Sequence, residues 1–292
     1  MSETMDDRKK RASEWFRSLQ RQLCGAFERL EARGGDLYAD AAAGRFVETP
    51  WKRGGADDDQ GGGVMAMLHG RVFEKAGVHF SEVHGEFSEE FRHQIPGASE
   101  DPRFWACGVS LIAHPLNPHA PAAHMNTRMI VTTENWFGGG GDLNPMHPAY
   151  RTRAHDDTEA FHSAMRAACD AHSPHYYEEY AAWCDRYFHL PHRNEPRGVG
   201  GIFYDRLNTG DWEKDFEFTQ DVGRAFLGIY PALVEKRMDQ QWSDEDREKQ
   251  LIQRGRYAEY NLLYDRGTTF GLKTGGNVES ILSSLPPLAR WP

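Results

Sequence analysis

The chain has 292 residues, 39% of them hydrophobic and 27% charged, a composition that predicts a folded protein with a substantial core. Lys and Arg number 34 against 44 Asp and Glu, so the formal net charge is −10. This acidic balance argues against a nucleic-acid or anionic-membrane binder. An anionic ligand would need a local positive site.

The four cysteines, Cys24, Cys107, Cys169 and Cys184, are scattered along the chain. Their spacing is typical of neither a zinc site nor a disulfide framework, and free thiols suit a reducing compartment. No apolar run approaches the length of a transmembrane helix. Residues 1–10 are polar, are expected to be disordered, and lack the apolar core of a secretory signal. We therefore predict a cytoplasmic protein without integral membrane association.

Apolar residues at helical spacing predict an amphipathic helix from about residue 6 to residue 32, ended by Gly34 and Gly35. Short β-like runs with turn signals follow, close enough in sequence for antiparallel pairing. These runs cover residues 64–73, 77–83, 104–113 and 122–133. Residues 54–63 form a Gly/Asp loop, and the four glycines at 138–141 are interpreted as a turn.

The second half is helical in pattern, with helices predicted at 156–171, 174–187, 211–237 and 243–254. The third is expected to be interrupted near Pro231. Strands are predicted at 200–206 and 257–264, and a short helix at 278–284. Strands before and after a helical block favour one α+β domain over residues 1–292, with a mainly antiparallel sheet.

The predicted strand at 122–133 carries the most informative pattern, His124-Met125-Asn126-Thr127-Arg128. Side chains alternate along a strand, so His124, Asn126 and Arg128 share one face while Thr127 points to the other. A titratable group, an amide and a fixed cation then lie side by side. This set suits an anionic small molecule that must gain or lose a proton.

Other motifs allow two interpretations each. His114 ends a strand and is either functional or bonded to the backbone. The glycines before Asp142 lack the spacing of phosphate or dinucleotide loops; they form a plain turn or let a flat ligand approach while Asp142 accepts its N–H bonds. The polar segment 192–198 is a solvated turn, or Arg197 in it clamps an anion. The glycine-rich segment 271–277 is a helix entry or an anion site.

Four stretches together resemble the oxygen-dependent coproporphyrinogen III oxidase family. They are residues 120–128 (APAAHMNTR), 136–145 (WFGGGGDLNP), 192–205 (HRNEPRGVGGIFYD) and 254–291 (RGRYAEYNLLYDRGTTFGLKTGGNVESILSSLPPLARW). The resemblance runs from about residue 10 to the C-terminus. It implies a homodimer, formed through the segment from Tyr257 onward, and a large, mainly antiparallel sheet flanked by α-helices on both faces.

The resemblance also implies an oxidoreductase of haem and porphyrin biosynthesis. Two propionates of coproporphyrinogen III become the vinyl groups of protoporphyrinogen IX, with O2 as oxidant and CO2 and H2O2 as products. No organic cofactor is expected, since O2 can oxidise the electron-rich porphyrinogen directly once a pyrrole proton is lost. A divalent metal is possible, but this chemistry does not need one.

The implied catalytic residues are His124, Asp142 and Arg128. Here His124 is the proton donor or shuttle, and Asp142 accepts pyrrole N–H bonds, so that Asp142→Ala is expected to lower turnover far more than it alters folding. The implied substrate contacts are Ser110, Asn126, Thr127, Arg128, Arg197, Gly275, Gly276 and Asn277.

The positions assigned to a divalent metal in bacterial members are His114, His124, His162 and His192. These histidines could hold Zn²⁺ or a related ion if they converge, or serve as substrate and proton-relay groups in a metal-free site. Asn277 replaces an Arg that many members carry, so one charge clamp is lost or supplied elsewhere, for example by Lys273.

Two rival functions are a metal-dependent enzyme built on the histidines and a tetrapyrrole carrier without catalysis. The enzyme would show chelator-sensitive activity, and the carrier would bind porphyrin without consuming O2. A radical, oxygen-independent decarboxylase is disfavoured because the sequence has no three-cysteine cluster for an iron–sulfur centre.

Overall fold

A single sheet of seven antiparallel strands dominates the computed structural model, which describes residues 3–55, 58–273 and 275–292. The strand order is β1-β2-β3-β4-β5-β6-β9. The strands are β1 (Val47–Lys52), β2 (Gly61–Leu68), β3 (Phe73–Glu86), β4 (Arg103–Pro115), β5 (Ala122–Val131), β6 (Asn135–Asn144) and β9 (Gly200–Leu207). The predicted α+β class with a mainly antiparallel sheet is confirmed.

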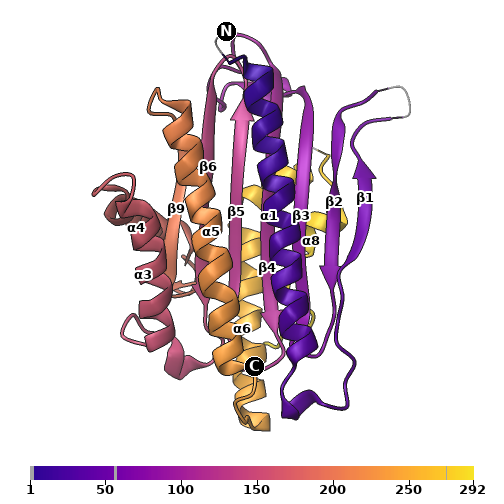
Figure 1. The fold of residues 1–292 in the computed structure, drawn as a ribbon, viewed down its shortest axis with the longest axis vertical. Coiled ribbons are helices and arrows are strands. Elements are labelled where there is room, and N and C mark those ends of the chain that lie inside the picture. The colour runs from indigo at the N-terminus through magenta and orange to yellow at the C-terminus, as the bar shows by residue number, and fades with distance from the viewer. Residues whose placement is uncertain (1–2, 56–57, 274) are drawn as a thin grey trace.

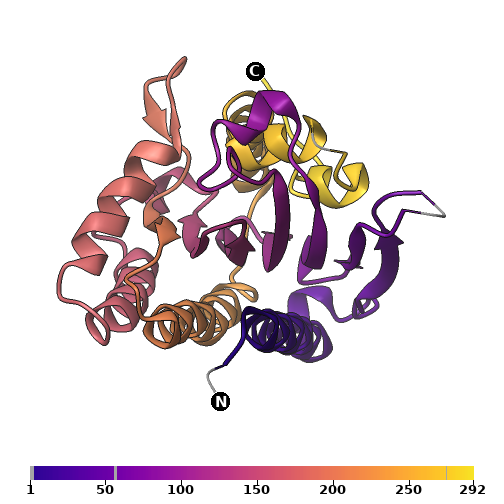
Figure 2. The ribbon, with the colours of Figure 1, turned by 90° about the horizontal axis from the view of Figure 1, so that it is seen from above.

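Helices cover both faces of this sheet, as predicted (Figures 1 and 2). The long helices α1 (Met5–Arg33) and α5 (Trp212–Arg237) lie side by side on one face. The other face is covered by α6 (Asp244–Leu263), α7 (Arg266–Lys273) and α8 (Val278–Leu282). The connection from β6 to β9 runs through α3 (Asp156–Asp170), α4 (Tyr176–Tyr187) and the small pair β7 (His189–Leu190) and β8 (Glu195–Pro196). A short helix, α2 (Glu89–Arg92), precedes β4.

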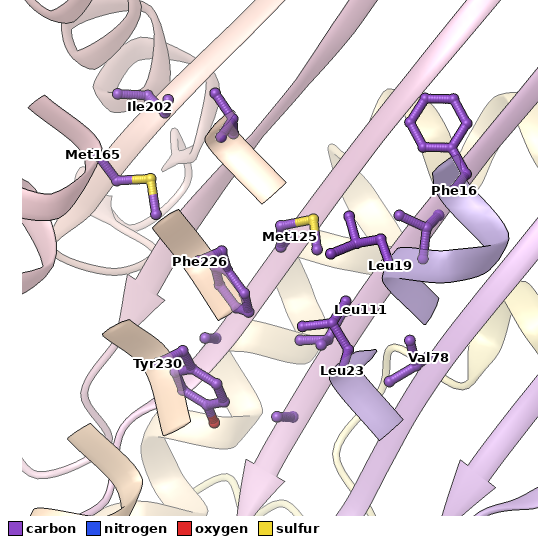
Figure 3. Close-up of a cluster of buried hydrophobic side chains, with 14 of the residues drawn as sticks. Phe16, Leu19, Leu23, Val78, Leu111, Met125, Met165, Ile202, Phe226 and Tyr230 are labelled. Carbon is purple, nitrogen blue, oxygen red and sulfur yellow. The ribbon is translucent and has the colours of Figure 1, made fainter. Parts of the chain in front are cut away.

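The main hydrophobic core lies between the sheet and the α1/α5 layer (Figure 3). Phe16, Leu19 and Leu23 recur at helical spacing on α1 and are fully buried. Residues drawn with them include Val78, Leu111 and Met125 of the strands and Phe226 and Tyr230 of α5. Burying each such side chain stabilises the folded state by about 1.5–3 kcal/mol, so the residues on this face of the sheet serve core packing. His124, Asn126 and Arg128 of β5 lie on the opposite face.

The start of the chain is ordered where disorder was expected. Helix α1 begins at Met5, and Thr4 and Asp7 form a capping box. The Asp7 N–H donates to the Thr4 hydroxyl at 3.2 Å, and the Thr4 N–H donates to the Asp7 carboxylate at 3.0 Å. These bonds satisfy N–H groups that a helix start leaves free. Residues 5–10 are helical, which agrees with the helix predicted from about residue 6 and not with the disorder expected of residues 1–10. Residues 1–2 lie outside the described part.

The four glycines predicted as a turn instead form the middle of β6, between β5 and β9. A Cβ on Gly139 would lie 2.6 Å from the backbone oxygen of Asn126 on the neighbouring strand. Gly140 has a φ of +142° and would place a Cβ against the backbone of Ile202. Only glycine tolerates this close approach and this backbone conformation, so the run marks a crowded strand interior rather than a turn.

Two other sequence-based assignments differ from the structure. The strand predicted at 257–264 is the second half of α6, where Tyr257, Tyr260 and Asn261 recur at helical spacing and are buried. Helix α5 continues through Pro231, where an interruption was expected. Strand β1 and helix α7 were not predicted. None of the described helices is long and apolar enough to span a membrane.

Candidate active site

The predicted alternation along β5 holds, and it places the polar residues on the side of the sheet that α6–α8 cover. Opposite His124 stand Ile112 on β4 and Asp142 on β6, and Ile112 packs against Tyr257 of α6. Ser110 stands opposite Asn126 and is exposed. We call this side of the sheet the site face.

Thr127 does not belong to the site face. Its side chain is fully buried, and its strand neighbours Met125 and Met129 belong to the core that α1 and α5 cover. Strand alternation turns the Thr127 side chain away from the site face, so the expected substrate contact of Thr127 would have to come from its backbone.

A hydrogen-bonded row runs along the site face from Arg128 to Asp142. Arg128 Nη1 donates to Asn126 Oδ1 at 2.8 Å, Asn126 Nδ2 lies 3.4 Å from His124 Nε2, and His124 Nδ1 lies 3.1 Å from Asp142 Oδ1. A guanidinium only donates, so it fixes which end of the Asn126 amide faces His124. The neutral imidazole then carries its proton on Nδ1, toward Asp142, and its lone pair on Nε2.

Asp142 is enclosed by donors and is 1% exposed. Arg197 Nη2 lies 2.7 and 2.8 Å from its two oxygens, and Asn144 Nδ2 donates to Oδ2 at 2.8 Å. Burial works to raise the pKa of Asp142, but the charge of Arg197 and the His124 contact outweigh it and lower this pKa to about 2. The carboxylate is ionised near neutral pH, and its oxygens face protein donors rather than a ligand.

Arg197 is 3% exposed and lies in an aromatic cage. Its guanidinium carbon is 3.9 Å from the ring centre of Phe188 and within 5 Å of those of Tyr257 and Tyr260. Its Nη1 donates to Asn261 at 2.8 Å. The sequence analysis offers Arg197 as the clamp of an anion, and in the structure the carboxylate that its guanidinium holds is Asp142.

Arg128 is a partly exposed cation of the site face. Its Nη2 donates to Asp205 Oδ1 at 2.8 Å, and the two side chains are 30% and 31% exposed. Gly138 lies between them, where a Cβ would be 2.7 Å from Asp205 Oδ1 and 2.9 Å from Arg128 Nη2. The sequence analysis did not single out Asp205. The signal that could have found it is a carboxylate that directly follows the buried residues 200–204 of β9.

Three basic side chains of β3 and β4 attach the α8 region over the site face. His79 Nε2 lies 2.6 Å from the Ser283 hydroxyl, His114 Nε2 donates to the backbone oxygen of Ser284 at 3.0 Å, and Lys75 Nζ donates to that of Leu285 at 2.8 Å. Burial lowers the pKa of His79 to about 4 and that of His114 to about 3, so both rings are neutral near pH 7.

The two remaining histidines of the predicted metal set have partners elsewhere. His162 Nδ1 lies 2.8 Å from the Tyr177 hydroxyl, and its Nε2 lies 3.0 Å from the Val199 oxygen. His192 Nε2 lies 2.8 Å from a Glu259 oxygen. In the described ranges no three of the four predicted ligands come within coordinating distance of one another. The structure thus does not assemble the predicted metal site.

Within the described part of the chain, one group of side chains does have the spacing of metal ligands. It consists of His155, Asp156 and Asp157 at the start of α3. Lys236 and Arg237 already form ion pairs with both carboxylates, at 2.5–2.9 Å. This arrangement is a compensated charge cluster that joins α3 to α5.

The loop at 275–277 connects α7 to α8. Asn277 caps α8, because its Oδ1 accepts the Ser280 N–H at 2.8 Å. The Gly276 N–H donates to the Gly271 oxygen at 2.9 Å. Lys273, the suggested replacement for the missing Arg, is exposed at the end of α7.

Comparison with known proteins identifies the family. The sequence model described as coproporphyrinogen III oxidase matches residues 11–292. The chain belongs to the coproporphyrinogen III oxidase family. Its relatives include the oxygen-dependent coproporphyrinogen-III oxidase of Rickettsia bellii (strain RML369-C), 53% identical over 282 residues and 96% of each chain. The enzyme of the same name from Rickettsia akari (strain Hartford) is 52% identical over 288 residues, 98% of this chain and 99% of the relative. The predicted family is therefore confirmed, and its relatives are named as enzymes.

Proposed function

We propose that this protein is an oxygen-dependent coproporphyrinogen III oxidase that forms protoporphyrinogen IX. Each of two propionates, –CH2–CH2–COO⁻, takes up one proton and reacts with one O2 to give –CH=CH2, CO2 and H2O2. Family membership over residues 11–292 supports the reaction. The observation that carries the chemistry is the row Arg128-Asn126-His124-Asp142, which combines a carboxylate binder with an oriented imidazole.

His124 acts as the proton shuttle in this proposal. Its Nε2 lone pair takes a proton from the porphyrinogen, while the ionised Asp142 behind it orients the ring and stabilises the imidazolium. The ring has room to act because His124 is partly exposed, unlike Asp142. Loss of that proton makes the reduced macrocycle easier for O2 to oxidise, so the substrate itself supplies the electrons.

Arg128 binds a substrate propionate, because a guanidinium can hold a carboxylate through two parallel N–H bonds. Ser110 and Asn126 lie in the adjacent row of the site face and contact the same part of the substrate. Gly275, Gly276 and Asn277 remain proposed contacts through the loop between α7 and α8. Since the Asn277 side chain caps α8, its contribution would come from the backbone.

The proposed reaction uses O2 as co-substrate and no organic cofactor, and no step passes through a metal. This choice follows from the positions of the four histidines. His124 faces Asp142, His114 holds the α8 region, and His162 and His192 have separate partners.

The first test is anaerobic loading of the protein with coproporphyrinogen III, followed by air and measurement of protoporphyrinogen and CO2, with and without a chelator. We expect two CO2 per substrate, strict dependence on O2, and no effect of the chelator. Binding without CO2 release would instead indicate a carrier. Activity lost with chelator and restored by one metal would contradict the metal-free scheme.

The protein is further proposed to be a cytoplasmic homodimer. Exposed large apolar side chains gather in the C-terminal part of the described chain: Leu262, Leu263, Phe270, Leu272, Val278, Leu288 and Trp291. Such a concentration marks an interaction surface, and a second copy of the chain is the partner we propose. Four cysteines without disulfides support a reducing compartment.

A further inference from the structure

A porphyrinogen presents two kinds of group to its enzyme: carboxylates at the periphery and four pyrrole N–H donors at the centre. A carboxylate acceptor is the natural partner for the central donors. Asp142, the residue expected to fill this role, already accepts from Arg197, Asn144 and His124 and is buried. On β5, β6 and β9, the other carboxylate of the site face is Asp205.

The backbone of β9 is shaped to present Asp205. Tyr204 pairs with Gly139 and Leu207 with Phe137, so Asp205 and Arg206 stand together opposite Gly138 in a bulge. The bulge lets Tyr204 and Leu207 both enter the core although they are three residues apart. Arg206 takes a φ of +55°, which a non-glycine residue rarely adopts. Bulges and such backbone strain occur preferentially where a side chain must be aimed at a functional site.

The pairing of Asp205 with Arg128 leaves both groups able to bind more. Asp205 accepts from Arg128 through Oδ1 alone, and within the described ranges no donor to Oδ2 is found. Arg128 uses Nη1 for Asn126 and Nη2 for Asp205, which leaves part of its five N–H donors for a ligand. Gly138 and Gly108, which pair with Arg128 on either side, place no side chain on this part of the site face.

We propose that Asp205 is the carboxylate that accepts pyrrole N–H bonds of the bound macrocycle, while Arg128 beside it binds a propionate. The proposal rests on the proposed function and adds a residue to it. The centre of the ring then lies over Gly138, and His124 faces its rim from two rows further along β5. In this arrangement Asp205 positions the ring and Asp142 orients the base.

The test compares two ligands that share four propionates and differ at the ring centre. Coproporphyrinogen III has four inner N–H donors, whereas its oxidised form, coproporphyrin III, has two N–H donors and two acceptor nitrogens. Binding of each is measured anaerobically by calorimetry for the wild type, Asp205→Asn and Arg128→Gln. The Asn variant keeps an oxygen for Arg128 but offers an NH2 donor in place of the second carboxylate oxygen.

We expect Asp205→Asn to lower the preference for the porphyrinogen over the porphyrin roughly ten- to hundredfold, the worth of a hydrogen bond to a charged group. Arg128→Gln should weaken both ligands by the same factor and leave the preference unchanged. If Asp205→Asn weakens both ligands equally, or neither, Asp205 only supports Arg128 and the inference is wrong. Failure of the proposed function would look different: the wild type would bind the porphyrinogen in air and release no CO2.

Discussion

The charged residues of this site differ in whether they are paired in the protein interior or are accessible to a ligand. Arg197 and Asp142 are buried together and neutralise each other, whereas Arg128 and Asp205 are partly exposed. A buried charge needs a buried partner, since an unpaired one carries a large desolvation cost. The expectation that Asp142→Ala spares the fold therefore does not suit a carboxylate in this position.

We predict that Asp142→Ala destabilises the protein by about 3–5 kcal/mol, because it leaves the Arg197 guanidinium buried and unpaired. The double variant Asp142→Ala/Arg197→Met should recover much of this loss, since Met suits the aromatic cage around Arg197. Turnover should stay low in both, because neither orients His124. Urea denaturation and CO2 release measure the two effects, and recovery of turnover in the double variant would contradict the role given to Asp142.

Among the elements, β6 and α6 show how packing overrides local preference. Four glycines usually break a strand, but in β6 they allow β5 and β9 to approach from both sides. The aromatic run at the end of α6 resembles a strand, but its helical spacing lets Tyr257, Tyr260 and Asn261 meet Arg197. Both elements carry residues that the site needs, so their geometry has direct consequences for it.

A matched pair of glycine substitutions tests the account of β6. Gly140→Ala should destabilise the protein by well over about 1 kcal/mol, because the φ of +142° and the Ile202 backbone both oppose a Cβ. Gly228→Ala on the exposed side of α5, where a Cβ meets nothing within 4 Å, should stabilise it by about 0.5–1 kcal/mol. Urea denaturation compares the two, and equal effects would refute the crowding argument.

At the scale of the whole molecule, the sheet has one face closed by a hydrophobic core and one face that holds the site. The helices over the site face also carry most of the exposed large apolar side chains. The proposed dimer surface thus lies on α6–α8, the helices that cover the site face, and Lys75, His79 and His114 attach the α8 region to the sheet. Dimer formation and the position of these helices over the site would then depend on the same C-terminal part of the chain.

We predict a dimer in solution that Leu263→Glu weakens at least about tenfold, because the substitution places a charge in an apolar interface. Val47→Glu is the matched control, since Val47 on the edge strand β1 is 67% exposed and Leu263 is 61% exposed. Light scattering on a size-exclusion column over a dilution series measures the dissociation. A monomeric wild type, or equal effects of the two variants, would contradict this surface.

Local periodicity was enough to predict the α+β class, helix α1, and the shared face of His124, Asn126 and Arg128 on β5. Which charged side chains meet depends on how distant segments pack together. Arg197, in the segment between β8 and β9, reaches Asp142 across 55 residues. Arg128 reaches Asp205 across 77 residues through the register of β5, β6 and β9. Register and burial are properties of paired strands, so no single segment could show that one ion pair is buried and the other open.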